Sequence, residues 1–451
     1  MNEKRSSFTG GLGFVLAAAG SAVGLGNLWR FPYLAAQYGG GIFILVYLIL
    51  AVTFGFSLLI LEIAIGRKTK QSSIKAYRML HKKFGFLGYL SAIVPIIILP
   101  YYSVIGGWVI KYMMVFLTGQ AKNAAADTYF GSFIGGTAQP LVLFLAFLAI
   151  TTIVVVCGVE KGIERVSKVM MPILLLITIG VCIYVAMLPG SGAGIRYYLL
   201  PDFSKFSFKT ICAAMGQLFY SMSIAMGIMV SYGSYVKEDI NLNNSVNHIE
   251  IFDTAVALLS GFMIVPAVYV FSGEAGLSTS GPGLMFQTLP KVFDMMPMGN
   301  VIGTCFFVLV FFAALTSSIS LMEAIVSMAM DHFKMKRTIA VIVVFAVSFL
   351  IGIPSALGFG VWSGITVLDM DFLTFFDYIS NSVLMPIVAI ATCILIGWFV
   401  GTKVIEEEIC KNGEPFKRKP IFRVMVRYIA PVCLLVILVF YSLAQFGFIS
   451  Y

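Results

Sequence analysis

Two short stretches place glycine, serine and asparagine in the middle of long apolar runs. Residues 20–27 read GSAVGLGN, and residues 221–227 read SMSIAMG. Where a helix is interrupted in this way, backbone carbonyl oxygens lose their helical partners and can bind a hard cation together with hydroxyl and amide oxygens. The free N–H groups at the start of the following half-helix can bind a carboxylate. The two stretches therefore predict a joint site for a small cation and an anionic group.

A plainer interpretation is that these glycines only let neighbouring helices pack closely, as small residues do in membrane bundles. Either stretch alone fits that interpretation well. Two interruptions at matching depth in two halves of a chain are, however, typical of a binding site between inverted repeats. The pairing therefore favours a binding site over simple close packing.

The elements that must position these residues are membrane-spanning helices. Of 451 residues, 59% are hydrophobic and 11% are charged, and the mean hydropathy is +0.96. Soluble domains carry about 25% charged residues. Apolar runs of about 20 residues recur, long enough to cross a hydrocarbon core of about 30 Å, and only helices satisfy their own backbone groups there. The chain has no phosphate-binding loop and no metalloprotease histidine pair, so neither ATP-driven pumping nor enzymatic chemistry is expected.

The apolar runs predict eleven spans in a single domain, residues 1–451. The expected spans are 10–37, 40–66, 86–117, 138–157, 167–188, 209–234, 250–273, 299–331, 337–353, 366–398 and 426–447. Residues 8–188 and 209–398 then form two five-helix repeats, and 426–447 is an additional helix. Because five is odd, the second repeat must be inverted relative to the first. The predicted fold is an all-α integral membrane protein with broken helices in spans one and six.

Lysine and arginine are concentrated in the loops that follow spans two, four, eight and ten. These loops cover residues 67–83, 161–168, 334–337 and 411–419. Cytoplasmic loops carry such an excess of basic residues, which predicts a multi-pass protein of the inner membrane with a cytoplasmic N-terminus and an external C-terminus. The net charge of +9 is explained by this bias and by contact with acidic lipids, so no nucleic-acid partner is expected.

The first span resembles a known family signature. Residues 24–33 read GLGNLWRFPY and are followed by three glycines at 39–41, which is similar to the first helix of the neurotransmitter:sodium symporter family. Agreement continues at Glu62, at residues 161–165 and at residues 316–318, and it covers essentially the whole chain. The bacterial amino-acid branch, with eleven spans and a leucine-transporter-like fold, is the most similar. The resemblance implies a sodium-coupled symporter that imports a large aliphatic or aromatic L-amino acid by alternating access. A sodium-dependent sensor or a channel-like protein of the same fold is the alternative.

The resemblance also implies two sodium sites. The first would use the carbonyl of Ala22, the side chains of Asn27, Ser221 and Asp253, and the carboxylate of the substrate. The second would use the carbonyls of Gly20, Val23 and Ala313 and the hydroxyls of Thr316 and Ser317. Animal members of the family add a chloride ion near the first site. Here Asp253 supplies a fixed negative charge, and a second anion beside it would be unfavourable, so no chloride requirement is expected.

The implied amino-acid site lies between the two interruptions. The substrate carboxylate would meet the amides of Leu25 and Gly26 and the hydroxyl of Tyr102. Its amine would meet carbonyls around Ala22, Tyr220 and Ser223, close to Ser221. The side-chain pocket would consist of Ile98, Tyr220, Met226, Ser320 and Leu321. Methionine is unbranched and deformable, which favours a pocket for large apolar side chains.

Further roles follow from the same resemblance. Arg30 and Asp371 would form an outer gate with Tyr220 as its lid, and Arg5 and Asp331 an inner gate beside Tyr235. Gly162 and Pro172 would form a hinge that unwinds the start of span five, although a proline kink fixed by packing is the simpler alternative. Glu62 would accept hydrogen bonds from the interrupted backbone of span six, which is a structural role; direct participation in transport is the alternative. Glu323 is expected to be structural as well.

Overall fold

The computed structural model describes residues 6–276 and 281–448, and within these ranges the chain forms helices and connecting loops without a β-sheet. Nine helical segments of the described chain are long and apolar enough to span a membrane, and a bent pair of helices makes a tenth. The bent pair is α1 (Gly11–Ala22) with the segment Gly26–Gln37, which ends in α2 (Phe31–Gln37). The nine segments are Gly41–Thr69, Lys82–Leu117, Ala138–Val156, Val159–Ala186, Leu242–Gly273, Gly299–Phe333, Arg337–Leu357, Phe372–Val400 and Lys419–Gln445.

Most of these segments contain one principal α-helix. The principal helices, in chain order, are α3 (Gly41–Leu50) and α4 (Phe56–Thr69), α6 (Gly85–Leu117), α9 (Ala138–Val156), α10 (Arg165–Ala186), α14 (Leu242–Gly276), α16 (Gly299–Phe333), α17 (Arg337–Leu357), α18 (Phe372–Asp377) and α19 (Met385–Ile394), and α21 (Lys419–Val424) and α22 (Ala430–Gln445). The sixth predicted span is present as two shorter helices, α12 (Phe208–Ser221) and α13 (Ile228–Tyr235).

The starts of four predicted spans differ clearly from the structure, and one of them is the eleventh, which begins at Lys419 rather than at 426. The seventh span starts at Leu242 rather than at 250, and the fifth is helical from Val159 rather than from 167. Polar residues at a membrane surface do not interrupt a helix, so hydropathy alone ends a span too early. The tenth span starts later than predicted, at Phe372, because the carboxylate of Asp371 caps the helix by accepting a hydrogen bond from the backbone N–H of Thr374 at 3.0 Å.

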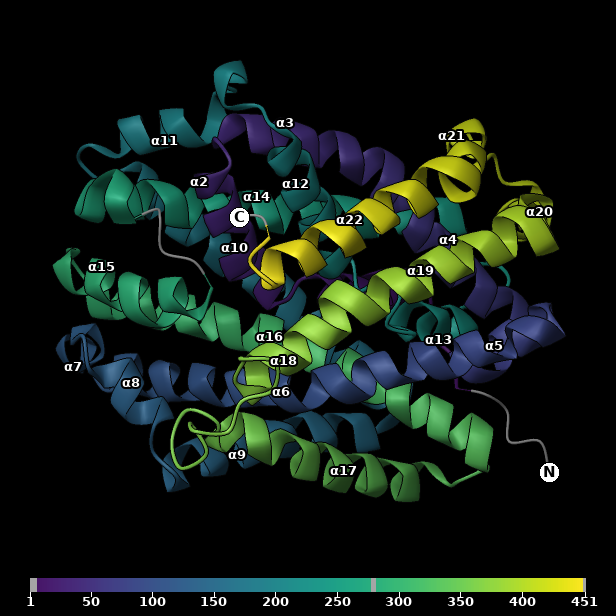
Figure 1. Cartoon of the computed structure of the whole chain (residues 1–451), viewed down its shortest axis with the longest axis horizontal. Coiled ribbons are helices and arrows are strands. Elements are labelled where there is room, and N and C mark those ends of the chain that lie inside the picture. Colours follow the sequence, from purple (N-terminus) through teal and green to yellow (C-terminus); the bar gives the residue numbers. More distant parts are fainter. Residues whose placement is uncertain (1–5, 277–280, 449–451) are drawn as a thin grey trace.

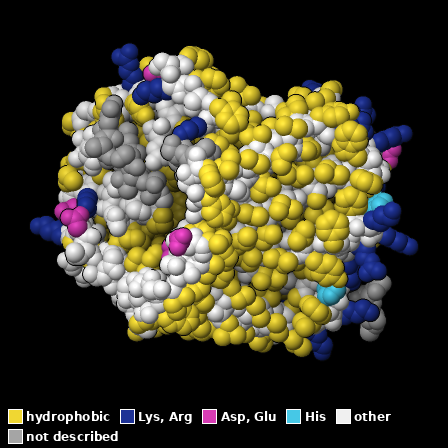
Figure 2. All heavy atoms as spheres, in the orientation of Figure 1, with side chains coloured by type: hydrophobic (Ala, Val, Ile, Leu, Met, Phe, Trp, Pro, Cys, Tyr) yellow, Lys and Arg dark blue, Asp and Glu magenta, His cyan; other side chains and the backbone are white. Residues whose placement is uncertain are grey.

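The helices pack as a bundle with two distinct ends (Figure 1). At one end lie α5 (Ser73–Leu80), α20 (Thr402–Ile409) and the start of the described chain, and we call it the α5 end. At the other lie α8 (Tyr129–Ile134), α11 (Ser191–Leu199) and α15 (Leu289–Met295), and we call it the α11 end. α6 packs against α16, and α19 runs beside α22. Figure 2 shows a broad apolar surface between charged side chains at the two ends, as a lipid-exposed bundle requires.

α4 and α13 approach each other through their backbones. A Cβ atom added to Gly66 would collide with the carbonyl oxygen of Val230, and one added to Gly233 would collide with that of Ile63. The contact therefore requires glycine on both helices, as in other close helix pairs of membrane proteins. It fixes α13 directly to α4.

Candidate functional site

The first interruption lies between α1 and Gly26. α1 ends at Ala22, and Val23 takes an extended conformation with φ −72° and ψ 97°. The chain then resumes in a wide π-helical turn over Gly26–Arg30, and the two parts of the span are bent by 54°. Several backbone groups around residues 20–26 are thereby left without helical partners.

The second interruption lies between α12 and α13. Three alternate residues take left-handed conformations: Ser223 with φ 53°, Ala225 with φ 65° and Gly227 with φ 69°. For a residue with a side chain, this conformation costs about 1–2 kcal/mol. Glu62 lies on α4 and is only 2% exposed. Its carboxyl group accepts a hydrogen bond from the Ala225 N–H at 2.8 Å. This bond stabilises the interrupted backbone from outside its own span.

The two interruptions bring together a first cluster of polar side chains. The Ser221 hydroxyl lies 2.9 and 3.1 Å from the two carboxylate oxygens of Asp253 and 3.2 Å from Asn27 Oδ1. Asn27 Nδ2 donates to Asp253 Oδ1 at 2.8 Å, and Asn27 Oδ1 accepts from the Gly24 N–H at 3.2 Å. All three side chains are buried. The cluster concentrates oxygen atoms and one carboxylate around the break in the first span.

A second cluster joins the same break to α16. The Ser317 hydroxyl lies 3.4 Å from the Gly20 carbonyl oxygen, 3.1 Å from that of Ser21 and 3.3 Å from that of Val23. The Thr316 hydroxyl donates to Phe312 and Ala313 carbonyls of its own helix, at 3.0 and 3.2 Å. The Ser21 carbonyl is absent from the predicted set, because the sequence of an interrupted helix does not reveal which carbonyls turn toward a neighbour.

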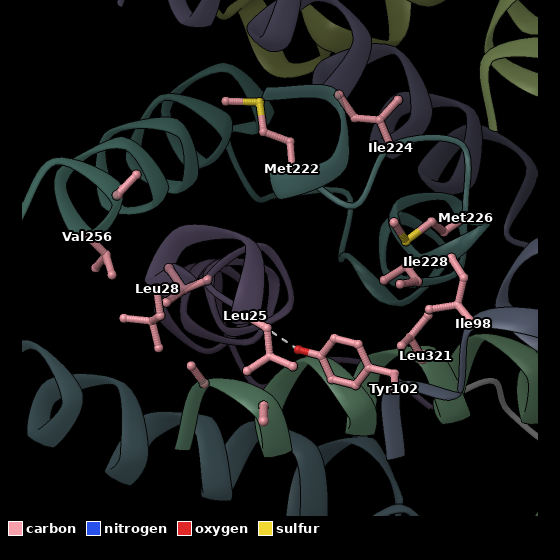
Figure 3. Close-up of a cluster of buried hydrophobic side chains, with 14 of the residues drawn as sticks. Leu25, Leu28, Ile98, Tyr102, Met222, Ile224, Met226, Ile228, Val256 and Leu321 are labelled. Atoms are coloured by element: carbon pink, nitrogen blue, oxygen red, sulfur yellow. Dashed lines mark hydrogen bonds between the residues drawn. The ribbon is translucent and has the colours of Figure 1, made fainter. Parts of the chain in front are cut away.

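A small cavity lies between the two interruptions and is lined by every residue of the predicted substrate set except Ser320. The Tyr102 hydroxyl accepts a hydrogen bond from the Leu25 N–H at 3.3 Å, drawn as the dashed line in Figure 3. Ile98, Met226 and Leu321 gather on one side of the cavity (Figure 3). The cavity thus has a polar end at the first break and an apolar end between α6, α13 and α16.

Ser320 differs from its predicted place in the pocket. Its hydroxyl donates to the Thr316 carbonyl at 3.0 Å and accepts from the Tyr232 hydroxyl at 2.7 Å, so it faces α13 instead of the cavity. Ile228 lines the cavity and was missed. It is the first residue of the half-helix that follows the second break, and that position was the signal that could have identified it.

A larger cavity of about 410 Å³ lies beyond Tyr220 and shares Leu25, Tyr102 and Tyr220 with the small one. The guanidinium carbon of Arg30 lies 5.3 Å from the centre of the Tyr220 ring, and Arg30 Nη2 lies 3.4 Å from the Tyr441 hydroxyl. A cation over an aromatic ring is attracted to its face. Tyr220 lines both cavities, and Arg30 lies over its ring and lines the larger one.

The acidic residue beside Arg30 is Asp377, and the predicted pairing of Arg30 with Asp371 is wrong for this structure. Asp377 lines the larger cavity with Arg30 and interacts with it electrostatically. Its Oδ1 accepts hydrogen bonds from Tyr101 at 3.1 Å and Asn381 at 2.6 Å. Asp371 instead caps the start of α18, where it binds both the backbone and the hydroxyl of Thr374.

The α5 end is packed around aromatic and charged residues. Arg5 lies outside the described residues, and its predicted partner Asp331 accepts a hydrogen bond from the Ser72 N–H at 2.7 Å. The Tyr235 hydroxyl donates to Glu323 at 2.7 Å, and the buried Glu323 also forms an ion pair with the partly exposed Arg337. Glu323 therefore joins α16 to α13 and to the start of α17.

The two predicted hinge residues lie in the fifth span. Gly162 belongs to a π-helical turn, Val159–Glu164, and Pro172 lies inside α10, which starts at Arg165. A Cβ atom added to Gly162 would collide with the Val154 carbonyl. In this structure the segment from 165 to 172 is wound, and the irregular turn comes before it.

Comparison with known proteins places this geometry in a wider group. A profile described as "Sodium:neurotransmitter symporter family" matches residues 5–130 and 131–451. A sodium-dependent transporter of Bacillus subtilis, YhdH, is 34% identical over 445 residues, which cover 96% of this chain and 97% of that protein. The rat sodium- and chloride-dependent GABA transporter 2 is 27% identical over 504 residues, with 99% of this chain and 81% of that protein covered. The crystal structure of MhsT in complex with L-phenylalanine superposes with a TM-score of 0.87 and 34% identity, covering 97% of this chain and 99% of that one.

Proposed function

The chain belongs to the sodium:neurotransmitter symporter family, and from this premise we propose that it couples sodium to the import of a hydrophobic L-amino acid. Members of this family are sodium-dependent multi-pass membrane transporters and not enzymes. The observation that supports the substrate class is the small cavity, which joins the interrupted backbone of the first break to an apolar end. An amino acid presents the matching chemistry, with its charges at one end and its side chain at the other.

The polar end of the cavity supports a carboxylate. The Gly26 amide starts a helical turn, where N–H groups without helical partners attract negative charge. The Tyr102 hydroxyl reaches the same place. No Lys, Arg, Asp or Glu side chain lines the small cavity within the described chain, so a charged substrate side chain would be buried without a partner. A large aliphatic or aromatic side chain fits beside Ile98, Met226 and Leu321.

The two polar clusters support two sodium ions, which travel as cargo with the amino acid. The first cluster offers Asn27, Ser221 and Asp253, and the substrate carboxylate would complete it beside the Ala22 carbonyl. The second offers Ser317 and Thr316 with carbonyls of the first break and of Ala313. Oxygen atoms of this kind suit a hard cation. Because the substrate would be a ligand of the first ion, binding of one would strengthen binding of the other.

Asp253 supports transport without chloride. Its buried carboxyl group lies beside Ser221 and, when ionised, would repel a second fixed anion there. The rat relative is named for its chloride dependence, so this is the point at which we expect the present chain to behave differently.

The unequal packing of the two ends supports alternating access. We assign the α11 end to the outside, because the larger cavity lies there above Tyr220, and the basic α5 end to the cytoplasm. We also assign α12 and α13 to one broken span, which gives eleven spans, ten of them in the inverted repeats 8–188 and 209–398 and the last in the additional C-terminal helix. The central site would then open alternately to the outside through the larger cavity and to the cytoplasm at the α5 end.

Uptake into liposomes tests the proposal. The purified protein is reconstituted, an inward sodium gradient is imposed, and accumulation of L-phenylalanine and L-leucine is compared with that of lysine, glutamate and a monoamine without a carboxylate. We expect accumulation of the first two only, and none when potassium replaces sodium. Binding without accumulation would indicate the sensor, flux that never exceeds equilibrium would indicate a channel, and preference for lysine or glutamate would refute the assigned pocket.

A further inference from the structure

The residues that precede α1 contact the sixth span at the α5 end. Phe8 has an exposed fraction of 0% and lies edge-on to the rings of Tyr232 and Tyr235, with ring centres 5.7 and 6.2 Å away. Its backbone N–H donates to the Tyr235 carbonyl at 3.2 Å. Phe8 is therefore fixed to α13 by both its side chain and its backbone.

The next residue binds the fifth span. The Thr9 N–H donates to Glu164 Oε2 at 2.9 Å, and the Thr9 hydroxyl donates to Glu164 Oε1. Lys168 Nζ lies 2.6 Å from Glu164 Oε1 and 3.3 Å from Thr9 Oγ1. On the other side, Lys237 Nζ donates to the Thr9 carbonyl at 3.1 Å. Thr9 is thus bonded at once to the fifth span and to the residues that follow α13.

Gly13 provides the space for this arrangement. A Cβ atom at residue 13 would coincide with the Glu164 carboxylate, so the carboxylate rests against the bare backbone of α1. Glu164 is 1% exposed. A buried carboxylate is tolerated only where charged and hydrogen-bonding partners compensate it, and here Thr9 and Lys168 provide that compensation.

The compensation depends on a wound helix. Glu164 is the last residue of the π-helical turn, and Lys168 lies four positions later, which is the spacing that places two side chains on one helix face. If the turn unwound, Lys168 would leave Glu164, and the carboxylate would also leave Thr9. If Thr9 left first, the carboxylate would lose its backbone donor and become easier to expose.

We propose that Thr9 and Glu164 form a clasp that keeps residues 159–168 wound while Phe8 remains on α13. Release of the N-terminal segment and unwinding of the fifth span then become a single event, which opens the route from the α5 end to the second sodium cluster. The clasp acts through the helix and touches neither ion nor substrate, so both are positioning residues. This inference rests on the proposed function only for the route it opens.

Hydrogen–deuterium exchange measures the clasp directly. Peptides covering residues 159–168 are followed in detergent with saturating sodium for the wild type, Glu164→Ala, Thr9→Val and Thr9→Ser. Glu160→Ala is the matched control, because Glu160 is an exposed carboxylate in the same turn. Loss of hydrogen bonds to a charged group should speed exchange in Glu164→Ala by about tenfold or more. Thr9→Val should show a smaller increase in exchange rate because the backbone hydrogen bond to Glu164 remains. Thr9→Ser keeps the hydroxyl and should exchange at the wild-type rate.

Three outcomes overturn the clasp. The first is an unchanged exchange rate in both Glu164→Ala and Thr9→Val. The second is an increase in Glu160→Ala as large as that in Glu164→Ala. The third is faster exchange that extends over α6 and α16, which would mean general destabilisation. Thr9 is exposed, so Thr9→Val keeps the test valid if Glu164→Ala does not fold. Exchange does not depend on transport. A wild type without sodium-driven uptake would therefore refute the proposed function and leave the exchange result standing.

Discussion

Replacing Ser317 with alanine should weaken sodium binding at the second cluster far more than at the first. The Ser317 hydroxyl lies within 3.1–3.4 Å of three carbonyl oxygens from the break in the first span, and we propose it as one of about five oxygen ligands of a dehydrated ion. A buried polar group that loses its partner costs about 1–3 kcal/mol. A loss of about 2 kcal/mol corresponds to about a 30-fold higher Kd for sodium.

The assay is substrate uptake measured against sodium concentration, with Ser318→Ala as the matched control. Ser318 is the adjacent residue, it is also buried, and its hydroxyl lies 3.0 Å from that of Thr151 on α9, away from the cluster. Ser318→Ala should lose about 1 kcal/mol of stability and keep the wild-type sodium dependence. If Ser317→Ala shows normal sodium activation, or if both variants shift equally, the assigned ligand is wrong.

Three further predictions test other parts of the site. Uptake should persist when gluconate replaces chloride at constant sodium, and its collapse would show that Asp253 does not serve as the permanent anion. Asp377→Asn should reduce uptake about tenfold or more, because it removes the charge beside Arg30. Asp371→Asn should lose only a helix cap worth about 1 kcal/mol of stability. A larger loss of uptake in Asp371→Asn than in Asp377→Asn would restore Asp371 as the gate residue. Pro172→Ala should slow turnover and leave equilibrium binding nearly unchanged, and wild-type turnover would mean that the proline is only a kink.

The parts of the site that follow from backbone irregularity could be predicted from the sequence. Glycine and hydroxyl residues inside apolar runs are conspicuous at residues 20–27 and 221–227, and the structure breaks both spans there. Glu62 could be assigned in the same way, because a carboxyl group inside an apolar helix requires a partner. The structure supplies that partner as the Ala225 N–H.

The parts that depend on helix rotation and helix start could not be predicted. Ser317 and Ser320 lie on one helix, and only packing decides that Ser317 faces the first break while Ser320 faces Tyr232. Asp371 and Asp377 both lie within the predicted tenth span, and hydropathy does not show that the helix starts between them, with Asp371 as its cap and Asp377 inside it. The hydrogen bond to the Thr374 N–H decides this, and it places Asp371 outside the larger cavity.

The glycine contact between α4 and α13 has a mechanical consequence. Helices that meet through side chains can slide by changing rotamers, but Gly66 and Gly233 leave no side-chain layer in which such sliding could occur. We therefore expect the two helices to move as one rigid unit. The hydrogen bond from the Ala225 N–H to Glu62 attaches the break between α12 and α13 to this unit. A displacement of α4 at the membrane surface would then move the break between α12 and α13, which lines the small cavity, by a similar amount.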